Sequence, residues 1–496
     1  MYTAGNNPEA VYCIGKISEY ISLLNSCRNY DAKQNAVYLY YEEQLSMPQG
    51  SGKNILLLNT DIHNIAFCIK NDVGSLFFFH NNYVISESDI SLLNTLESKY
   101  LVNKSYLLLK QLNLIKLVFD IRKKSVVLSS LPTHVQMEHT TFCNARCIMC
   151  DHYIARNRGA KHLKLSTVEC LESLLPYVSL VIMHGNGEPL LNPDILPIFD
   201  LYKKYQIRTS LNTNLSYLSD DILSSIRDNC ENIHVSCDGS NEMQYESIRQ
   251  GLSYSEFISN VQRLAAVCSS TEKVLEVVLM RQNIRNTKTF VQFAYDYGFK
   301  KVIFNALGCN EWIGNMKDGL YNCLSSAIYY CRIAKEEGDR LGVNVITPFE
   351  YLEDYESGID SLGCLITEDY PSPEYSQALH EKYPWYTNTI AVDKLTKQSI
   401  TEYDKSKIIT GICEYPFAKT YIDLSGNVSF CCPASRKFVD TLSYDKNFKY
   451  IWNNDMYQGI RRTFYSKRMP LLCKDCYLVK NRTLNFLDCC KLTGGK

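Results

Sequence analysis

The middle of the chain alternates strand and helix signals six times, and this pattern restricts the fold more than any other feature. Between about residues 133 and 346, short apolar and β-branched runs recur, and amphipathic stretches separate them. The expected strands are 134–139, 180–184, 207–212, 232–236, 274–280 and 301–305. Strands that alternate with helices predict an α/β fold with a parallel sheet, either doubly wound or rolled into a partial (β/α)6 barrel. In both architectures, ligands bind at the carboxyl ends of the strands.

A chain of 496 residues is too long for one hydrophobic core, so further domains are expected on both sides of this region. The expected units are an N-terminal α+β domain at 1–132, the alternating core at 133–346, a bridging segment at 347–410 and a small cysteine-rich domain at 411–496. Within the core, Ser166 and Glu169 form a capping-box pattern, which predicts a helix that begins after Ser166. A long amphipathic helix is expected at about 321–340.

The N-terminal domain combines strand and helix signals. Strands are expected at 55–58, 65–69, 75–80, 115–119 and 125–128. Two helices are indicated between them by apolar residues at three- to four-residue spacing, namely Ile90, Leu93, Leu96, Tyr106, Leu109 and Leu112. This order fits either a winged-helix-like module or a generic α+β cap.

Charge and hydropathy narrow the range of partners. A formal net charge of -1 gives no general reason to expect nucleic acid or an anionic membrane as partner. No apolar run reaches the roughly 20 residues of a membrane span, and the first residues lack a signal-peptide pattern. The most basic stretch, Arg461 to Arg468, is expected to be a solvated face. A cytoplasmic protein is therefore expected, and because cytoplasmic thiols stay reduced, its 21 cysteines are interpreted first as metal ligands.

Three cysteines lie in one loop directly after the first expected strand. Cys143, Cys147 and Cys150 provide three thiolates, which can bind three irons of a cubane cluster and leave the fourth iron open. A zinc site would need a fourth ligand, and His152 is near enough in sequence to supply it. Both a cluster and a small zinc loop are therefore consistent with the residue types.

The spacing Cys143-xxx-Cys147-xx-Cys150 resembles the signature of the radical S-adenosylmethionine superfamily, whose fold is a six-unit partial (β/α) barrel. The resemblance covers about residues 133–345. It implies a [4Fe–4S] cluster whose open iron binds S-adenosylmethionine, and a 5′-deoxyadenosyl radical that abstracts hydrogen from a substrate. It also implies a flavodoxin- or ferredoxin-type electron donor. In such an enzyme the cofactor supplies the chemistry, and the protein supplies orientation and exclusion of water.

The resemblance extends to residues at later strand ends. It implies cofactor binding by Gly187, Glu188, Asn212, Ser236, Asp238 and Arg249. Gly187 and Glu188 resemble part of a Gly-Gly-Glu segment that receives the cofactor ammonium group, and Arg249 resembles an arginine that holds the cofactor carboxylate. Asn186 stands where the first glycine of that segment usually lies. Each residue type is also an ordinary turn or cap former.

A second cysteine set lies near the C-terminus. A hairpin signal at 423–427 is expected to bring Cys413 near Cys431, and the pair Cys473 and Cys476 completes four thiolates. Four thiolates fit a fully ligated [4Fe–4S] cluster or a structural zinc equally well. The arrangement resembles the auxiliary-cluster extension called SPASM in its two-cluster form and twitch in its one-cluster form. The family spacing favours Cys431 over Cys432.

The number of auxiliary clusters and the reaction are inferred from the same resemblance. Only Cys489 and Cys490 follow the last pair of ligands, so one auxiliary [4Fe–4S] cluster is expected. Because a fully ligated cluster cannot bind substrate, we expect it to take an electron from a substrate radical. No catalytic side chain is evident, although Cys309, just beyond the sixth strand, is a weak candidate hydrogen donor with a packed thiol as the alternative.

Three functions remain open on this basis. The first is oxidative modification of a peptide or protein, with the N-terminal domain as a candidate peptide-recognition module. The second is dehydrogenation of a small polar metabolite such as an amino sugar. The third is a non-catalytic protein that binds a metal or cluster.

Overall fold

The computed structural model describes residues 87–150, 159–307, 318–320, 324–348, 403–408, 413, 415–431, 438–470 and 473. Several sequence expectations fall outside these ranges. They are the strands at 55–58, 65–69 and 75–80, most of the bridging segment, and the residues His152, Cys309, Cys432, Cys476, Cys489 and Cys490.

The six expected core strands are confirmed as neighbours in one sheet. They are β1 (His134–Met137), β3 (Leu180–Met183), β4 (Arg208–Thr213), β5 (Cys230–Ser236), β7 (Glu272–Leu279) and β8 (Lys301–Ala306), and β9 (Asn344–Ile346) follows β8. Adjacent strands in this series are parallel and follow chain order. When every crossover is right-handed and the strand order does not reverse, all the connecting helices lie on the same face of the sheet. The sheet is therefore a partial barrel and not a doubly wound sheet.

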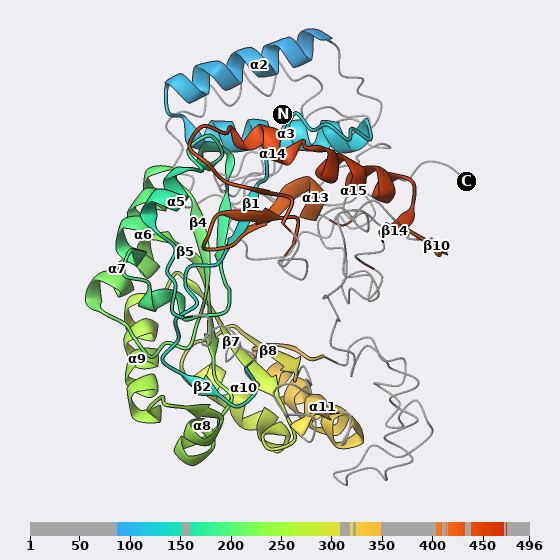
Figure 1. The fold of residues 1–496 in the computed structure, drawn as a ribbon. Coiled ribbons are helices and arrows are strands. Elements are labelled where there is room, and N and C mark those ends of the chain that lie inside the picture. The colour runs from blue at the N-terminus through green and yellow to red at the C-terminus, as the bar shows by residue number, and fades with distance from the viewer. Residues whose placement is uncertain are drawn as a thin grey trace, which may run out of the picture.

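The connecting helices cover the outer face of this barrel. They are α5 (Leu165–Glu169), α6 (Ile195–Lys204), α7 (Asp220–Asn229), α8 (Glu242–Ile248), α9 (Tyr254–Val267), α10 (Thr287–Asp296) and α11 (Leu324–Leu341). In Figure 1, α6, α7 and α9 lie along one side of β4 and β5. Side chains alternate accordingly: Ile233 and Val235 of β5 are buried, whereas His234 and Ser236 are partly exposed. The partly exposed face is the inner, concave face.

One predicted helix start is wrong, because a residue distant in sequence caps this helix. α5 begins at Leu165, with Lys164 as its N-cap and no side-chain cap from Ser166. The free amide of Leu165 instead donates to Asp194 Oδ2 at 3.1 Å, so a carboxylate from a neighbouring loop replaces the local cap. The helix expected at about 321–340 is confirmed as α11, over its described span.

The N-terminal helices are confirmed as α2 (Glu87–Val102) and α3 (Tyr106–Arg122), but two strand predictions there are wrong. The apolar run 115–119 continues α3, and 125–128 is irregular. Leu114, Leu117, Phe119 and Ile121 are all buried. A helix that is buried on several sides carries apolar residues around most of its circumference. Its sequence therefore lacks an amphipathic stripe and resembles that of a buried strand. The expected strand–helix order of a winged helix is therefore absent from the described part of this domain.

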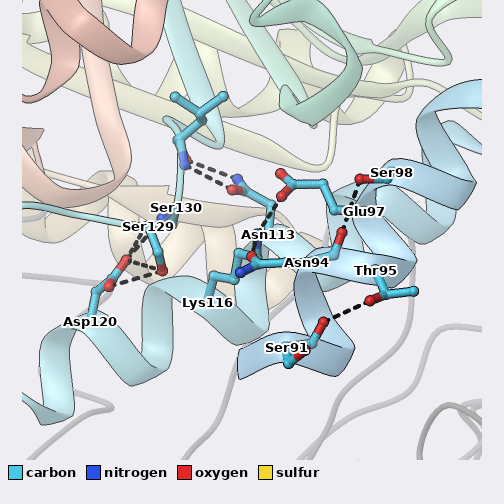
Figure 2. A network of polar contacts seen from close by, with 11 residues as sticks. Ser91, Asn94, Thr95, Glu97, Ser98, Asn113, Lys116, Asp120, Ser129 and Ser130 are labelled. Carbon is cyan, nitrogen blue, oxygen red and sulfur yellow. Dashed lines mark hydrogen bonds and ion pairs between the residues drawn. The ribbon is translucent and has the colours of Figure 1, made fainter. Parts of the chain in front are cut away.

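Polar side chains of α3 fix its position, as Figure 2 shows. Asn113 accepts from the Leu131 amide and donates to the Leu131 carbonyl, both at 2.8 Å. Lys116 pairs with Glu97 of α2 at 2.5 Å. Asp120 accepts from the Ser130 amide at 2.9 Å and from its hydroxyl at 2.8 Å. These bonds attach α3 to α2 and to the segment that leads into β1.

The C-terminal segment continues the barrel sheet. The predicted hairpin is confirmed as β11 (Lys419–Ile422) and β12 (Asn427–Ser429), and β13 (Asp440–Thr441) follows. Its turn depends on Asp423, whose Oδ1 accepts from the amides of Ser425 and Asn427, both at 2.8 Å. β11 pairs in parallel with β1, from His134 opposite Lys419 to Met137 opposite Ile422. The cysteine-rich segment and the barrel therefore share one hydrogen-bonded sheet.

Five further elements lie in the described residues of the C-terminal part. They are β10 (Tyr403–Ile408), paired with β14 (Arg468–Pro470), and the helices α13 (Tyr415–Ala418), α14 (Phe448–Trp452) and α15 (Asp455–Tyr465). The expectation that the 461–468 stretch is a solvated face is wrong for Arg461, which is 0% exposed. Its guanidinium donates to the carbonyls of Pro416 and Val126 at 2.7 and 3.0 Å, and lies 4.5 Å from the Trp452 ring centre.

Among the described residues, no helix combines the length and the apolar character needed to cross a bilayer.

Candidate active site

The three-cysteine loop lies between the carboxyl end of β1 and a small two-stranded sheet. Cys147 lies on β2 (Arg146–Cys147), which pairs antiparallel with β6 (Arg249–Gln250). The Cys150 amide donates to the Cys147 carbonyl at 3.2 Å, which turns the chain between these thiols. Cys143 and Cys147 are partly buried and Cys150 is exposed. Burial raises the pKa of Cys143 to about 11, and the neighbouring Glu188, Cys147 and Cys150 add to the rise.

Gly187 allows the loop after β3 to touch the cysteine loop directly. The Glu188 amide donates to the Phe142 carbonyl at 2.8 Å. A Cβ added at Gly187 would overlap the Thr140 carbonyl and lie 2.6 Å from Phe142 O. Glycine is therefore required for this backbone approach, whatever its role toward a ligand.

Glu188 connects the ends of two neighbouring strands. It is 2% exposed, and its oxygens accept from Thr213 Oγ1 at 2.7 Å and from the Asn214 amide at 2.6 Å. Burial raises the pKa of Glu188, although these hydrogen bonds oppose the rise. Asn214 Nδ2 in turn lies 3.7 Å from Cys143 Sγ. Part of the hydrogen-bonding capacity of Glu188 is thus used inside the protein, and its proposed contact with an ammonium group stays a prediction.

Arg249 and Asp238 form a buried ion pair beside the cysteine loop. Arg249 Nη2 lies 2.6 Å from Asp238 Oδ2, and Asp238 Oδ1 accepts from the Val278 amide at 2.7 Å. Arg249 Nη1 lies 4.0 Å from Cys147 Sγ. The buried Arg249 Nε has no hydrogen-bond partner within the described ranges. A buried, unmatched guanidinium donor fits a ligand carboxylate, so the residues present fit the implied cofactor.

The contacts of Asn186 account for its departure from the family pattern. Its amide N–H and its side-chain Nδ2 both donate to Glu138 Oε1, at 3.1 and 2.8 Å. Burial raises the pKa of Glu138, and the hydrogen bonds from Asn186 oppose the rise. The Glu138 amide also donates to the Ile422 carbonyl of β11 at 3.1 Å. Glu138 therefore lies between the loop after β3 and the C-terminal hairpin, a position that the sequence did not reveal.

The inner face of the barrel carries a polar cluster that sequence reasoning missed. His234 Nδ1 lies 2.7 Å from Glu276 Oε1, and Asn212 Nδ2 donates to Glu276 Oε2 at 3.2 Å. Ser236 lies two residues further along β5, on the same face as His234. Asn212 and Ser236 were predicted from strand ends. For His234 and Glu276, the sequence offered one signal, which was polar residues at alternate positions of otherwise apolar strands.

The C-terminal cysteines are only partly described. Cys413, Cys431 and Cys473 are partly buried and pack against the main core, and Cys431 follows β12 closely. Among the described residues, no three His, Cys, Asp or Glu side chains are grouped closely enough to define a metal site by position alone. Both ligand sets therefore rest on thiol chemistry and loop position, and the choice between Cys431 and Cys432 stays a prediction.

Two family models match the chain at these places. Residues 137–294 match the radical SAM superfamily, and residues 413–477 match SPASM, an iron–sulfur cluster-binding domain. The chain therefore contains a region that matches the radical SAM superfamily within an α/β fold, as the sequence predicted. More particularly, a C-terminal region that matches the SPASM domain accompanies it. The two domains imply a [4Fe–4S] cluster with S-adenosylmethionine and an auxiliary iron–sulfur cluster, which confirms the expected cofactors and favours clusters over zinc.

Individual relatives are distant. The mycofactocin maturase MftC of Mycobacterium ulcerans (strain Agy99) is 22% identical over 171 residues, which are 34% of this chain and 45% of the relative. MftC of Mycobacterium tuberculosis (strain ATCC 25618 / H37Rv) is 23% identical over 171 residues, 34% of this chain and 43% of the relative. The matched region thus spans less than half the length of these curated relatives.

Solved structures with a similar arrangement are also remote in sequence. Streptococcus suis SuiB bound to S-adenosylmethionine has a TM-score of 0.47 and 15% identity, and the match covers 68% of this chain and 69% of SuiB. Histidine-tagged anSMEcpe with bound AdoMet has a TM-score of 0.45 and 14% identity, over 70% of this chain and 84% of anSMEcpe.

Proposed function

We propose that this enzyme oxidatively modifies a peptide or protein by hydrogen abstraction. The buried Arg249, whose Nε is unmatched within the described ranges and whose Nη1 lies 4.0 Å from Cys147 Sγ, carries the proposal that S-adenosylmethionine binds at this loop. The attached SPASM domain supports an oxidative outcome, because an auxiliary cluster accepts electrons. The MftC relatives are named maturases, which supports a peptide substrate over a small metabolite.

Individual residues of the core have separate roles in this proposal. Cys143, Cys147 and Cys150 hold the first cluster. Arg249 receives the cofactor carboxylate, and Asp238 fixes its guanidinium. When bound, the cofactor supplies a hydrogen-abstracting radical. The remaining cofactor-binding residues are Gly187, Glu188, Asn212 and Ser236.

The C-terminal part and the flanking regions have separate roles in this proposal. Cys413, Cys431, Cys473 and Cys476 hold one auxiliary cluster. A flavodoxin- or ferredoxin-type protein in the cytoplasm donates electrons. The domain at 1–132 contacts the peptide substrate, the core occupies 133–346, and the segment 347–410 joins it to the cluster domain at 411–496.

The test is an anaerobic assay with reconstituted protein, dithionite and S-adenosylmethionine. We expect 5′-deoxyadenosine from the wild type and none from Cys147→Ala, with Cys170→Ala as a matched cysteine control that retains formation. Candidate peptides and amino sugars are added in parallel, and mass spectrometry detects the loss of two hydrogens. Absence of 5′-deoxyadenosine with every substrate class would refute the proposal, and oxidation of the sugar alone would replace the peptide with a small metabolite.

A further inference from the structure

An imidazole–carboxylate pair lies on the inner face of the barrel. The His234 side chain on β5 is 20% exposed and the Glu276 side chain on β7 is 24% exposed. Their 2.7 Å contact uses His234 Nδ1 and one carboxylate oxygen, and Asn212 occupies the other oxygen. The carboxylate is thus held from two strands, β4 and β5. Such a pair contributes little to the stability of a fold, because the desolvation cost of partly burying the charges offsets much of their electrostatic attraction.

The geometry assigns the tautomer of His234. Burial disfavours charge on Glu276, but hydrogen bonds from His234 and Asn212 and the charges of His234 and His184 outweigh it, and the pKa of Glu276 is lowered. An ionised carboxylate only accepts, so Nδ1 must carry the proton. In the neutral ring, Nε2 then holds a basic lone pair. Within the described ranges, no hydrogen-bond partner is found for Nε2.

The pair adjoins the residues proposed to bind S-adenosylmethionine. Asn212 belongs to both groups, and Asn212 and His234 are register partners of β4 and β5. Ser236 lies two positions along β5 and is the register partner of Glu276. Side chains two positions apart on one strand face are separated by roughly 7 Å. A substrate carbon that reaches the cofactor therefore also comes within reach of His234.

We propose that His234, oriented by Glu276, accepts the proton that the substrate releases during its oxidation. This inference rests on the proposed function and adds a substrate class: a peptide residue whose reacting carbon bears an O–H, S–H or N–H group. When bound, the cofactor would take the C–H hydrogen atom and the auxiliary cluster would accept one electron, while His234 Nε2 takes the X–H proton. The carbon and heteroatom are left joined by a double bond, so the substrate loses two electrons and two protons in total.

The first test uses His234→Ala in the reconstituted enzyme with a modified peptide. We expect retained 5′-deoxyadenosine, a fall in oxidised product of about 10²-fold or more, and partial recovery with added imidazole. His234→Gln, a conservative change in size, is the second variant if the alanine variant does not fold. His134→Ala is the matched control, because His134 begins β1 at the opposite end of the sheet. Unchanged product yield, or loss of 5′-deoxyadenosine together with product and without rescue, would overturn the assignment.

A second readout does not depend on turnover. In the ¹⁵N spectrum of the full chain, neutral His234 is expected to carry its proton on Nδ1, and Glu276→Ala is expected to mix the two tautomers. Protonated Nε2 in the neutral wild-type ring would refute the proposal. These results can be told apart from failure of the proposed function. In that case the wild-type enzyme itself forms no 5′-deoxyadenosine.

Discussion

Cys147 and Arg249 face each other as register partners of β2 and β6, although 102 residues separate them in the chain. The Ile148 amide extends this pairing by donating to the Ile248 carbonyl at 3.0 Å. The cysteine loop is therefore attached by backbone hydrogen bonds to the segment that carries the proposed carboxylate-binding arginine. Movement of either segment changes the position of the other.

Replacement of Arg249 by glutamine is expected to weaken S-adenosylmethionine binding and to destabilise the protein. The change leaves Asp238 buried without its cation, which costs about 3–5 kcal/mol when one partner of a buried pair is removed. Equilibrium dialysis measures the first effect and thermal unfolding the second. Arg263→Gln is the control, because Arg263 pairs with Asp220, whose side chain is 95% exposed. Unaltered cofactor affinity in a folded Arg249→Gln protein would contradict the role given to this arginine.

Gly187→Ala is expected to reduce cluster incorporation. The new Cβ overlaps the carbonyls of Thr140 and Phe142, so the cysteine loop must move away from the loop after β3. Overpacking of this kind costs about 1–3 kcal/mol. Iron and sulfide analysis after reconstitution measures the effect. In Gly342→Ala the Cβ meets no atom within 4 Å, although its φ of +70° adds strain, so full iron content is expected. Equal iron content in both variants would disprove the steric account.

Asn186→Gly restores the usual family residue and is expected to destabilise this chain. It removes the Nδ2 donor from Glu138, at a cost of about 1–3 kcal/mol. The pKa of Glu138 is raised by burial, so the folded state binds the proton more tightly and stability falls as pH rises above the ordinary value of 4.5. The variant is expected to show a steeper fall over that range. Thermal unfolding of the full chain at several pH values measures it, and parallel curves for variant and wild type would argue against the Asn186 contact.

Arg461→Ala is expected to destabilise the junction between the N-terminal and C-terminal parts. It leaves the buried Pro416 carbonyl and the partly buried Val126 carbonyl without their donor, at about 1–3 kcal/mol for the buried group. Thermal unfolding measures the loss. The neighbouring Arg462→Ala is the control, since Arg462 is exposed and, among the described residues, its side chain bonds only that of Gln458, four residues away. Equal melting temperatures for both variants would show that the buried arginine contributes little.

The barrel strands could be predicted because their signal is local. Apolar residues in β1, β3, β4, β5, β7 and β8 are continuous or alternate with period two, and turn formers separate them. The cysteine loop could be predicted because its three cysteines lie within eight residues of sequence. The hairpin at Asp423 could be predicted because an Asp side chain and Gly426, with φ +81°, define its turn within five residues.

Other features depended on contacts that no local pattern contains. The N-terminus of α5 uses Asp194, which is 29 residues from Leu165. The run 115–119 is helical because α3 is covered by other elements, and Arg461 is buried because carbonyls from two distant segments surround it. The inner pair of His234 and Glu276 joins strands that are 42 residues apart.

The sequence by itself determined the resemblance to the radical SAM and SPASM families, the strand order along the chain and the two sets of thiols. The tertiary structure alone decided that the sheet is a barrel, that the C-terminal hairpin joins it through β11 and β1, and which polar groups meet inside it. The physical reason is that spacing fixes which residues share a loop or a strand face. Pairing across the sheet and burial determine which residues become partners, and these partners lie in segments tens to hundreds of residues apart.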